Sequence, residues 1–258
     1  MVPEVITSPN EDALVENLRQ YLSEKLTYLL EQTGTIGIGV SGGSMPKIFS
    51  KAILSIEHIN WKRIRIFMVD ERNVDINDID SNQGAYLRLF PEHLHEVFVP
   101  IPIKENVHET AKEYEKNLRM IVLPELFNTA PRFDLIFLGV GPDGHTASLF
   151  PGKERLPKIT DHNWVSFVTD SPKPPSERVT LTLDTINYGK NVVFVITGDQ
   201  KAEIVRGIFD REQKYPAALV RPINDKVTLF LDEAAASYIP SRSEEMSSPE
   251  PESPPPFE

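Results

Sequence analysis

Apolar and polar positions alternate along this chain with two different periods. Near the N-terminus, leucines recur at helical spacing between charged residues, which predicts an amphipathic helix ending near Gly34. Short apolar runs then predict strands at 36–40, 64–69, 133–138, 164–168, 179–183, 192–196 and 227–231. Further helices are predicted at 44–56, 82–90, 108–126, 199–211 and 233–238. This alternation favours an α/β fold, with a mostly parallel, doubly wound, Rossmann-like sheet and helices on both faces.

The length and the local composition predict one folded domain and a tail. The chain has 258 residues, of which 40% are hydrophobic, and such a chain can bury one sizeable core. From residue 241 to residue 258 the composition changes to Ser, Pro and Glu, with Phe257 as the only aromatic residue. So little apolar surface does not offset the entropy of ordering the segment. We therefore expect a single α/β domain over residues 1–240 and a disordered acidic tail over 241–258.

Charge and cysteine content narrow the classes of function. A net charge of −11 disfavours nucleic acid or an anionic membrane as a partner, so an anionic substrate must be held by a local cluster of donors. The absence of cysteine excludes disulfides and thiolate chemistry. The first 20 residues lack a signal-peptide pattern, and no apolar run is long enough to cross a membrane. We expect a soluble, monomeric, cytoplasmic protein that acts on a small molecule.

The apolar run 133–138 leads directly into a turn rich in glycine that carries Asp143 and His145. The carboxyl ends of strands in open α/β sheets border the ligand crevice, so this turn is a candidate catalytic site. An imidazole with an ordinary pKa of about 6.5 is suited to take a proton from water. Asp143 either orients that ring or caps the turn, and His145 can alternatively be a histidine with only a structural role. The pair His93 and His95 lacks further ligands, and we expect no bound metal.

A second glycine-containing loop follows the predicted strand 36–40 and enters a helix. Its residues are Ser41, Gly42, Gly43 and Ser44. Backbone N–H groups that converge at a helix N-terminus form a site for an anion. The glycines also match the dinucleotide fingerprint G-x-G-x-x-G, but two of them lie inside the strand and no acidic residue follows at about 20 positions. An anion site is therefore favoured over nicotinamide binding, with a tight turn without a ligand as the simpler alternative.

Charged residues stand at the ends of three other predicted elements. Asp70, Glu71 and Arg72 end the strand 64–69, where they either form a solvated loop or hold substrate, with Arg72 as the leading contact. Arg178 follows the proline-rich stretch 171–177, and a rigidly held guanidinium can bind phosphate in bidentate fashion. Lys201 is expected in the first turn of a helix, where a cation opposes the helix dipole and therefore indicates function.

These segments together resemble the 6-phosphogluconolactonase family over about residues 36 to 237. The motifs that carry the resemblance are Ser41-Gly-Gly-Ser44, Asp70-Glu-Arg72, Gly139-Val-Gly-Pro-Asp-Gly-His145, Ser171-Pro-Lys-Pro-Pro175, Arg178-Val-Thr-Leu181 and Leu231-Asp-Glu-Ala-Ala235. The resemblance implies hydrolysis of 6-phospho-D-glucono-1,5-lactone, the second step of the oxidative pentose phosphate pathway, without metal or organic cofactor. It implies that His145 is the general base and that Arg72, Arg178, Lys201 and the 41–44 loop hold the substrate. We expect the phosphate at this loop, held by Arg178 and Lys201 together, and Arg72 or backbone N–H groups at the developing oxyanion.

Two alternatives remain, a related enzyme and a protein of another class. The related glucosamine-6-phosphate deaminases carry a carboxylate five residues after the histidine, where this chain has Phe150, and a tyrosine at the position of Arg72. Both differences favour the lactonase, although Asp70 remains and can act as a base. A non-catalytic phosphosugar-binding protein that uses its acidic tail for a partner is disfavoured by the intact His145, Asp143 and Arg72.

Overall fold

The computed structural model describes residues 3–32, 34–121, 132–152, 163–224 and 226–240. The strands are β1 (Glu4–Ser8), β2 (Ile36–Val40), β3 (Ile64–Met68), β4 (Asp70–Arg72), β5 (Leu135–Leu138), β6 (Val165–Val168), β7 (Arg178–Leu181), β8 (Val192–Ile196) and β9 (Val227–Asp232). The α-helices are α1 (Glu11–Gln32), α2 (Met45–Leu54), α3 (Asn82–Leu87), α4 (Val107–Ile121), α5 (Leu183–Asn187), α6 (Ala202–Phe209) and α7 (Glu233–Ala236). The predicted tail lies outside the described residues.

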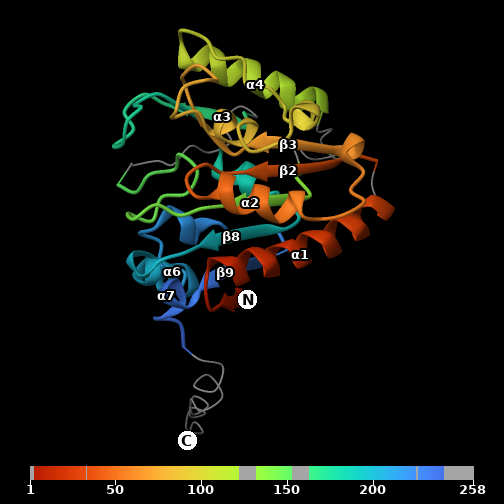
Figure 1. The fold of residues 1–258 in the computed structure, drawn as a ribbon. Coiled ribbons are helices and arrows are strands. Elements are labelled where there is room, and N and C mark those ends of the chain that lie inside the picture. The colour runs from red at the N-terminus through yellow and green to blue at the C-terminus, as the bar shows by residue number, and fades with distance from the viewer. Residues whose placement is uncertain (1–2, 33, 122–131, 153–162, 225, 241–258) are drawn as a thin grey trace, which may run out of the picture.

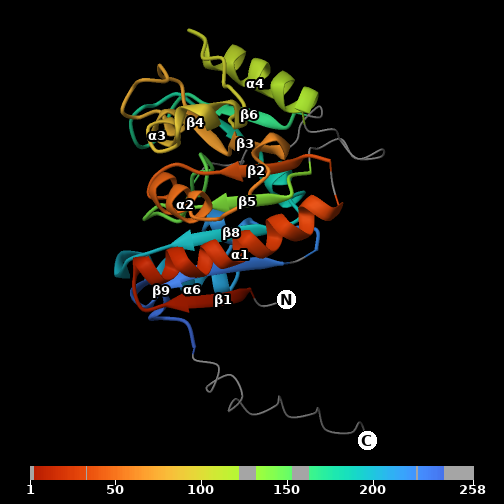
Figure 2. The ribbon, with the colours of Figure 1, turned by 45° about the vertical axis from the view of Figure 1, so that its right-hand side comes forward.

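The larger sheet confirms the predicted α/β fold. In the described part of the chain, six parallel strands lie in the order β1-β9-β8-β5-β2-β3 (Figures 1 and 2). Every residue of β2, β5 and β8 is buried, as expected for parallel strands covered on both faces. From the middle of the sheet, β2 leads outward to β3, whereas β5 leads the other way to β8. The direction of winding therefore reverses between β2 and β5, and a ligand crevice forms at such a point.

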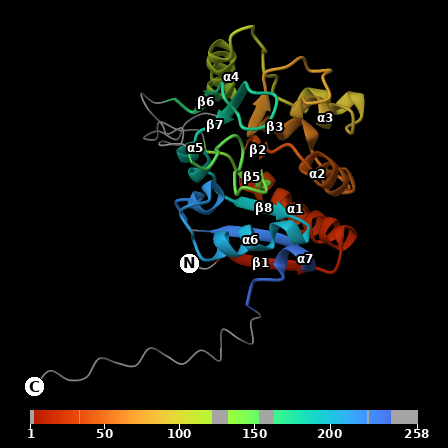
Figure 3. The same ribbon diagram turned by 90° about the vertical axis from the view of Figure 1, so that its left-hand side faces the viewer.

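Helices cover both faces of this sheet, as the alternating pattern predicts. The leucine stripe of α1 is buried against α2 and the sheet; its residues are Leu14, Leu18, Leu22, Leu26 and Leu29. In the end-on view, α1 and α2 lie on one side of the sheet and α5 lies on the other (Figure 3). This placement follows from right-handed crossovers. Successive strands are added toward one edge of the sheet from β2 and toward the other edge from β5, so the connecting helices lie on opposite faces. Among the described residues, no helix is both long enough and apolar enough to span a membrane.

A second, smaller sheet was not predicted. The segments 164–168 and 179–183 were expected within the α/β alternation, but β6 and β7 pair antiparallel, and β4 joins them in the order β4-β7-β6. Parallel neighbours need a crossover of about a dozen residues or more, and residues 169–177 are too few. The predicted strand 179–183 is also too long at its C-terminal end, since β7 ends at Leu181. Thr182 caps α5 by accepting a hydrogen bond from the backbone N–H of Thr185 at 3.2 Å.

The small sheet changes the environment of the Asp70–Arg72 segment. These residues form the short strand β4, whose partner is β7: Asp70 lies opposite Thr180, and Arg72 lies opposite Arg178. A backbone hydrogen bond of 2.8 Å from Leu181 to Val69 joins the small sheet to the end of β3. The segment is therefore a structured strand at the edge of the crevice, and its first two residues are buried.

Candidate active site

A cleft of about 460 Å³ opens at the carboxyl ends of the parallel strands. The loops after β2, β5 and β8 form one wall, and β4, β7 and the 171–177 loop form the other. The predicted site residues that line it are Ser41, Gly42, Gly43, Ser44, Asp70, Arg72, His145, Arg178 and Lys201. The structure thus brings together residues that lie up to 160 positions apart, from Ser41 to Lys201. Asp143 does not line the cleft itself and lies directly behind His145.

The loop after β2 presents unpaired hydrogen-bond donors to the cleft. Gly43 adopts a positive φ of 69°, and the chain then enters α2. Among the backbone hydrogen bonds of the described residues, none uses the N–H groups of Gly42, Gly43 or Ser44, which lie at the N-terminus of α2. The hydroxyl Oγ of Ser41 is buried and has no hydrogen-bond partner there either. This arrangement suits a ligand oxygen or a phosphate group.

The turn after β5 holds His145 against Asp143. The imidazole Nδ1 contacts the Asp143 carboxylate, and the same carboxylate oxygen accepts a hydrogen bond from the backbone N–H of His145 at 3.3 Å. Asp143 therefore contacts both the ring and the backbone of the turn. The two roles considered for it, orienting the ring and capping the turn, are compatible with each other. Glycine is required at position 141, because an added Cβ would lie 2.0 Å from atoms of the imidazole ring.

The electrostatics of this pair favour a neutral imidazole. Burial acts to raise the pKa of Asp143, but the hydrogen bonds from His145 outweigh it and place that pKa below its ordinary value. Burial lowers the pKa of His145 in spite of the neighbouring carboxylate. An ionised Asp143 accepts a hydrogen bond from the protonated Nδ1, so the neutral imidazole keeps its lone pair on Nε2. Such a ring is suited to accept a proton at neutral pH.

Arg178 has a different environment from the one expected. Its guanidinium donates hydrogen bonds to carbonyl oxygens of the preceding loop: from Nε to Pro175 at 3.1 Å, and from one terminal nitrogen to Lys173 at 2.9 Å and to Pro174 at 3.2 Å. The residue is only 3% exposed. The sequence suggested that the prolines hold Arg178, and the structure shows that Arg178 also holds the proline loop.

The corner around Arg178 contains charges of both signs. Burial and the neighbouring Arg72 lower the pKa of Arg178, while Asp70 opposes them. Arg72 donates to the backbone carbonyl of Asp80 at 2.8 Å, and its buried Nε has no partner among the described residues. The buried carboxylate of Asp70 accepts a hydrogen bond of 2.8 Å from the hydroxyl of Ser148. This corner is therefore a fixed array of guanidinium and carboxylate groups.

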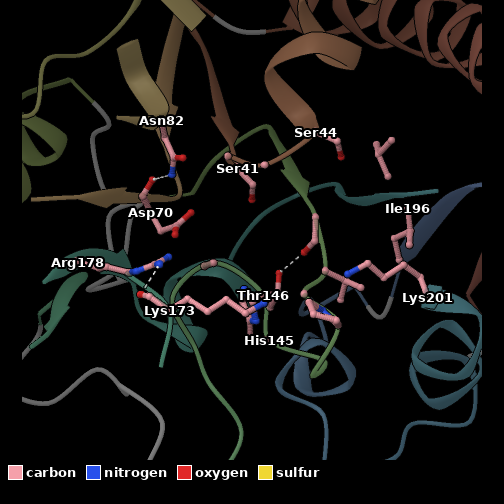
Figure 4. Close-up of a pocket in the computed structure, with 18 of the residues that line it drawn as sticks. Ser41, Ser44, Asp70, Asn82, His145, Thr146, Lys173, Arg178, Ile196 and Lys201 are labelled. Carbon is pink, nitrogen blue, oxygen red and sulfur yellow. Dashed lines mark hydrogen bonds between the residues drawn. The ribbon is translucent and has the colours of Figure 1, made fainter. Parts of the chain in front are cut away.

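Lys201 enters the cleft from the other side. It ends a short 3₁₀ turn (Asp199–Lys201) that precedes α6, and Figure 4 shows it far from Arg178, beyond His145. Burial and the nearby Lys173 lower the pKa of Lys201, whereas Asp143 opposes them. Arg178 and Lys201 thus line the same cleft from different walls, and the expectation that they hold one phosphate together stays a prediction. The walls differ because of the strand order, in which β7 belongs to the small sheet and β8 to the large one.

Several residues of the site were missed by sequence reasoning. Asn82 and Lys173 line the cleft, together with Asp80, Thr146 and Gln200. Asn82 packs against the 41–44 loop, since a Cβ added to Gly42 would lie 1.9 Å from its side-chain oxygen. Its amide nitrogen donates to the carbonyl of Asp70 at 2.9 Å. The proline motif already contained Lys173, but no local signal marks Asn82.

Glu71 lies behind the cleft wall rather than in it. Its buried carboxylate accepts backbone N–H groups from Asn82 and Gln83, each at 2.7 Å, and from Arg72 at 2.8 Å. Burial raises its pKa to about 7 despite these bonds. Glu71 therefore joins β4 to α3 and positions two residues of the cleft wall.

The histidines considered for a metal lie elsewhere. His93 is exposed, and the Nε2 atom of His95 is 3.0 Å from the backbone carbonyl of Phe90. Within the described ranges, no group of three or more His, Cys, Asp or Glu side chains is arranged to hold a metal ion.

Comparisons with known proteins identify the family. The family model described as glucosamine-6-phosphate isomerases/6-phosphogluconolactonase matches residues 9–229. A Caenorhabditis elegans protein named, provisionally, as a 6-phosphogluconolactonase is 63% identical, covering 100% of this chain and 95% of that protein. The Rattus norvegicus 6-phosphogluconolactonase is 36% identical, covering 91% of this chain and 92% of the rat protein.

The solved structures agree with the sequence comparisons. The structure of 6-phosphogluconolactonase from Trypanosoma brucei superposes with a TM-score of 0.78 at 28% sequence identity, covering 92% of this chain and 99% of that one. The fold and the sequence thus lead to the same group of enzymes. The chain belongs to the family of glucosamine-6-phosphate isomerases and 6-phosphogluconolactonases.

Proposed function

We propose that this enzyme hydrolyses 6-phospho-D-glucono-1,5-lactone to 6-phospho-D-gluconate, with His145 as general base. The observation that carries the proposal is the His145–Asp143 pair, which presents a neutral imidazole to a cleft whose opposite surfaces offer unpaired donors. A base, a pocket of suitable size for a sugar and separate donors for anionic oxygens are what hydrolysis of a charged lactone requires. The names of the relatives support the same substrate.

In the proposed reaction, Nε2 of His145 takes a proton from a water molecule as that water attacks the lactone carbonyl carbon. The carbonyl oxygen becomes an oxyanion, which the positive charge of Arg72 on the cleft wall stabilises. The bond between the carbonyl carbon and the ring oxygen then breaks, and the ring oxygen leaves as a hydroxyl with the proton from His145. General base assistance contributes about 10²- to 10⁴-fold. Because the lactone also opens unaided, this contribution suffices.

We place the substrate phosphate at the N-terminus of α2, with Lys201 as its cation. The N–H groups of Gly42, Gly43 and Ser44, which have no partner in the described part of the chain, support this position, and Lys201 enters from the same wall. The corner at Arg178 is less suited to a phosphate, since the buried carboxylate of Asp70 would repel it. Arg178 and Asp70 then contact the sugar end, and Arg178 also keeps the 173–175 loop in place.

The first test compares wild-type enzyme, the His145→Ala variant and a reaction without enzyme. The lactone is generated in situ, and acid release is followed in weak buffer at neutral pH. The proposal requires that wild type accelerates acid release above the unaided rate and that the variant does not. Wild-type protein that matches the blank while correctly folded would refute the lactonase function. Glucosamine 6-phosphate would then be the next substrate to test, although Phe150 occupies the place of the deaminase carboxylate.

A further inference from the structure

Phe150 lies between functional groups from the two walls of the cleft. Its ring centroid is 4.8 Å from that of His145, with the two planes inclined at 43°. The guanidinium carbon of Arg178 lies 5.6 Å from the centroid of the same phenyl ring. Phe150 is 2% exposed and therefore makes these contacts away from solvent. One apolar ring thus contacts the proposed base and a cation of the opposite wall.

The backbone before Phe150 is fixed at several points. Leu149 donates its N–H to the carbonyl of Thr146 at 3.0 Å, and the hydroxyl of Thr146 donates to the carbonyl of Gly139 at 2.9 Å. Ala147 has a positive φ of 50°, and Ser148 is bound to Asp70. Such a conformation persists when the surrounding structure over-determines it. The turn therefore places Phe150 at one defined position beside His145.

The two contacts of His145 restrain different motions of its ring. The bond to Asp143 fixes the nitrogen Nδ1 but leaves the ring free to tilt about that contact. The phenyl ring of Phe150 lies against the imidazole and opposes this tilt. Aromatic pairs at this separation contribute beyond their buried area. Together the two contacts define where Nε2 points.

We propose that Phe150 is a positioning residue that fixes the plane of the His145 imidazole and separates it from the Arg178 guanidinium. This inference rests on the function proposed for His145 above. The phenyl ring excludes water from the imidazole. On this side the Arg178 guanidinium faces an aromatic ring instead of another charged group.

The charged groups around His145 define what removal of the ring should do. Asp143 from the same turn and Asp70 from β4 favour the charged imidazole, Lys173 from the proline loop disfavours it, and burial has the largest effect. Arg178 lies across the phenyl ring. Without the ring, water reaches the imidazole, weakens burial, which is the largest of these effects, and screens the charge of Arg178. The titration of His145 should therefore move to higher pH, as should the acid limb of kcat/KM.

The test uses Phe150→Leu, with Phe133→Leu as a matched control. Phe133 is also fully buried in the segment that contains β5, but its ring packs on Phe67 instead of the cleft. An NMR titration follows the His145 ring, assigned with His145→Gln, and kcat and KM are measured across pH. Thermal unfolding confirms that each variant is folded. Phe150→Met, whose flexible side chain fills irregular gaps more readily, carries the same expectation if the leucine variant does not fold.

We expect Phe150→Leu to move the His145 titration upward in pH and to lower kcat by about 10- to 100-fold, with a smaller change in KM. Phe133→Leu should lower the melting temperature and leave the titration at its wild-type position. The positioning role would be overturned if His145 titrated at its wild-type pH in Phe150→Leu, or if Phe133→Leu shifted the His145 titration equally. The NMR titration does not depend on turnover. An inactive wild-type enzyme would therefore refute the proposed function, while the titration would still test whether Phe150 positions His145.

Discussion

The two walls of the cleft differ in how their polar groups are bonded. On the wall formed by the parallel sheet, Ser41 Oγ and the N–H groups at the start of α2 have no partner among the described residues, and Lys201 makes no ion pair there. On the wall formed by the small antiparallel sheet, Arg178 donates to three carbonyl oxygens, and Asp70 accepts from Ser148. One wall offers free donors, whereas the polar groups of the other are mostly bonded to the protein, with the buried Nε of Arg72 as an exception among the described residues.

Because of this difference, we expect the two walls to contribute differently to substrate binding and to the reaction. Free donors gain their hydrogen bonds from the ligand, so they contribute to binding. Groups that are already held do not reorganise when charge develops in a reaction, so they provide a fixed electrostatic environment. His145 belongs to the parallel-sheet wall, but Phe150 connects it to the antiparallel wall through Arg178. Substitutions on each wall should therefore have different kinetic signatures.

The largest expected effect is that of His145→Ala. Loss of the proposed general base should lower kcat by about 10²- to 10⁴-fold with little change in KM, because the donors proposed to bind the phosphate remain. Steady-state kinetics at neutral pH, corrected for the unaided reaction, measure both constants. A variant whose KM rises as much as its kcat falls would show that His145 mainly binds substrate.

Glu71→Gln tests whether the antiparallel wall is held by a buried carboxyl group. Burial raises the pKa of Glu71 to about 7 in the folded protein, above its ordinary value of 4.5. The folded state thus binds this proton more tightly, so the stabilisation is complete below pH of about 4.5 and is lost as the pH rises through about 7. The shift corresponds to about 3 kcal/mol at most. Glutamine does not titrate and should lack this dependence.

Urea unfolding of wild type and Glu71→Gln across this pH range provides the measurement. The other carboxylates titrate equally in both proteins, so the difference in the free energy of unfolding isolates Glu71. We expect wild type to lose stability relative to the variant as the pH rises. A difference that stays constant with pH would mean that the pKa of Glu71 is not raised.

The same division explains what could be predicted from the sequence. The fully apolar runs of β2 and β8 and the glycine turn before His145 are local signals, and they predicted the parallel sheet and the cleft at its carboxyl edge. By contrast, β1 has only Ser8 buried and β4 is a charged segment of three residues, so neither has the pattern of a strand. The antiparallel pairing of β6 and β7 was missed because the apolar pattern does not distinguish direction. The short connection between them was the available signal.

The roles of side chains were harder to predict than their presence at the site. Arg178, Lys201 and His145 were all expected at the cleft, and all line it. Which wall each residue occupies depends on strand order, which no local pattern contains. The three bonds of Arg178 to backbone carbonyls depend on the conformation of the 173–175 loop, and Asn82 is placed only through Asp70 and Glu71.

Arg178→Lys tests whether the bonded guanidinium acts through its shape or only through its charge. Lysine keeps the charge, but its single ammonium lacks the fork that reaches the three carbonyl oxygens. We expect kcat to fall about 10- to 100-fold with a smaller change in KM, since the lost charge-assisted hydrogen bonds that fix this wall are worth about 1.5 to 3 kcal/mol. Arg206→Lys, at a half-buried position on α6 away from the cleft lining, is the control and should behave as wild type. Full activity of Arg178→Lys would show that charge alone suffices on this wall.

The smallest expected effect is that of Lys201→Gln on the parallel-sheet wall. Lys201 is half-buried, and a cation that remains accessible to water contributes a modest attraction that salt screens. We expect KM to rise about 3- to 10-fold at low ionic strength, with kcat nearly unchanged. As salt is added, KM of wild type should approach that of the variant, because screening removes the contribution that the substitution has already removed. Lys112→Gln on α4 changes the net charge equally at an exposed position away from the cleft, so it controls for the global field. If Lys112→Gln had the same effect, the attraction would come from overall charge, and Lys201 would no longer be the cation assigned to the phosphate.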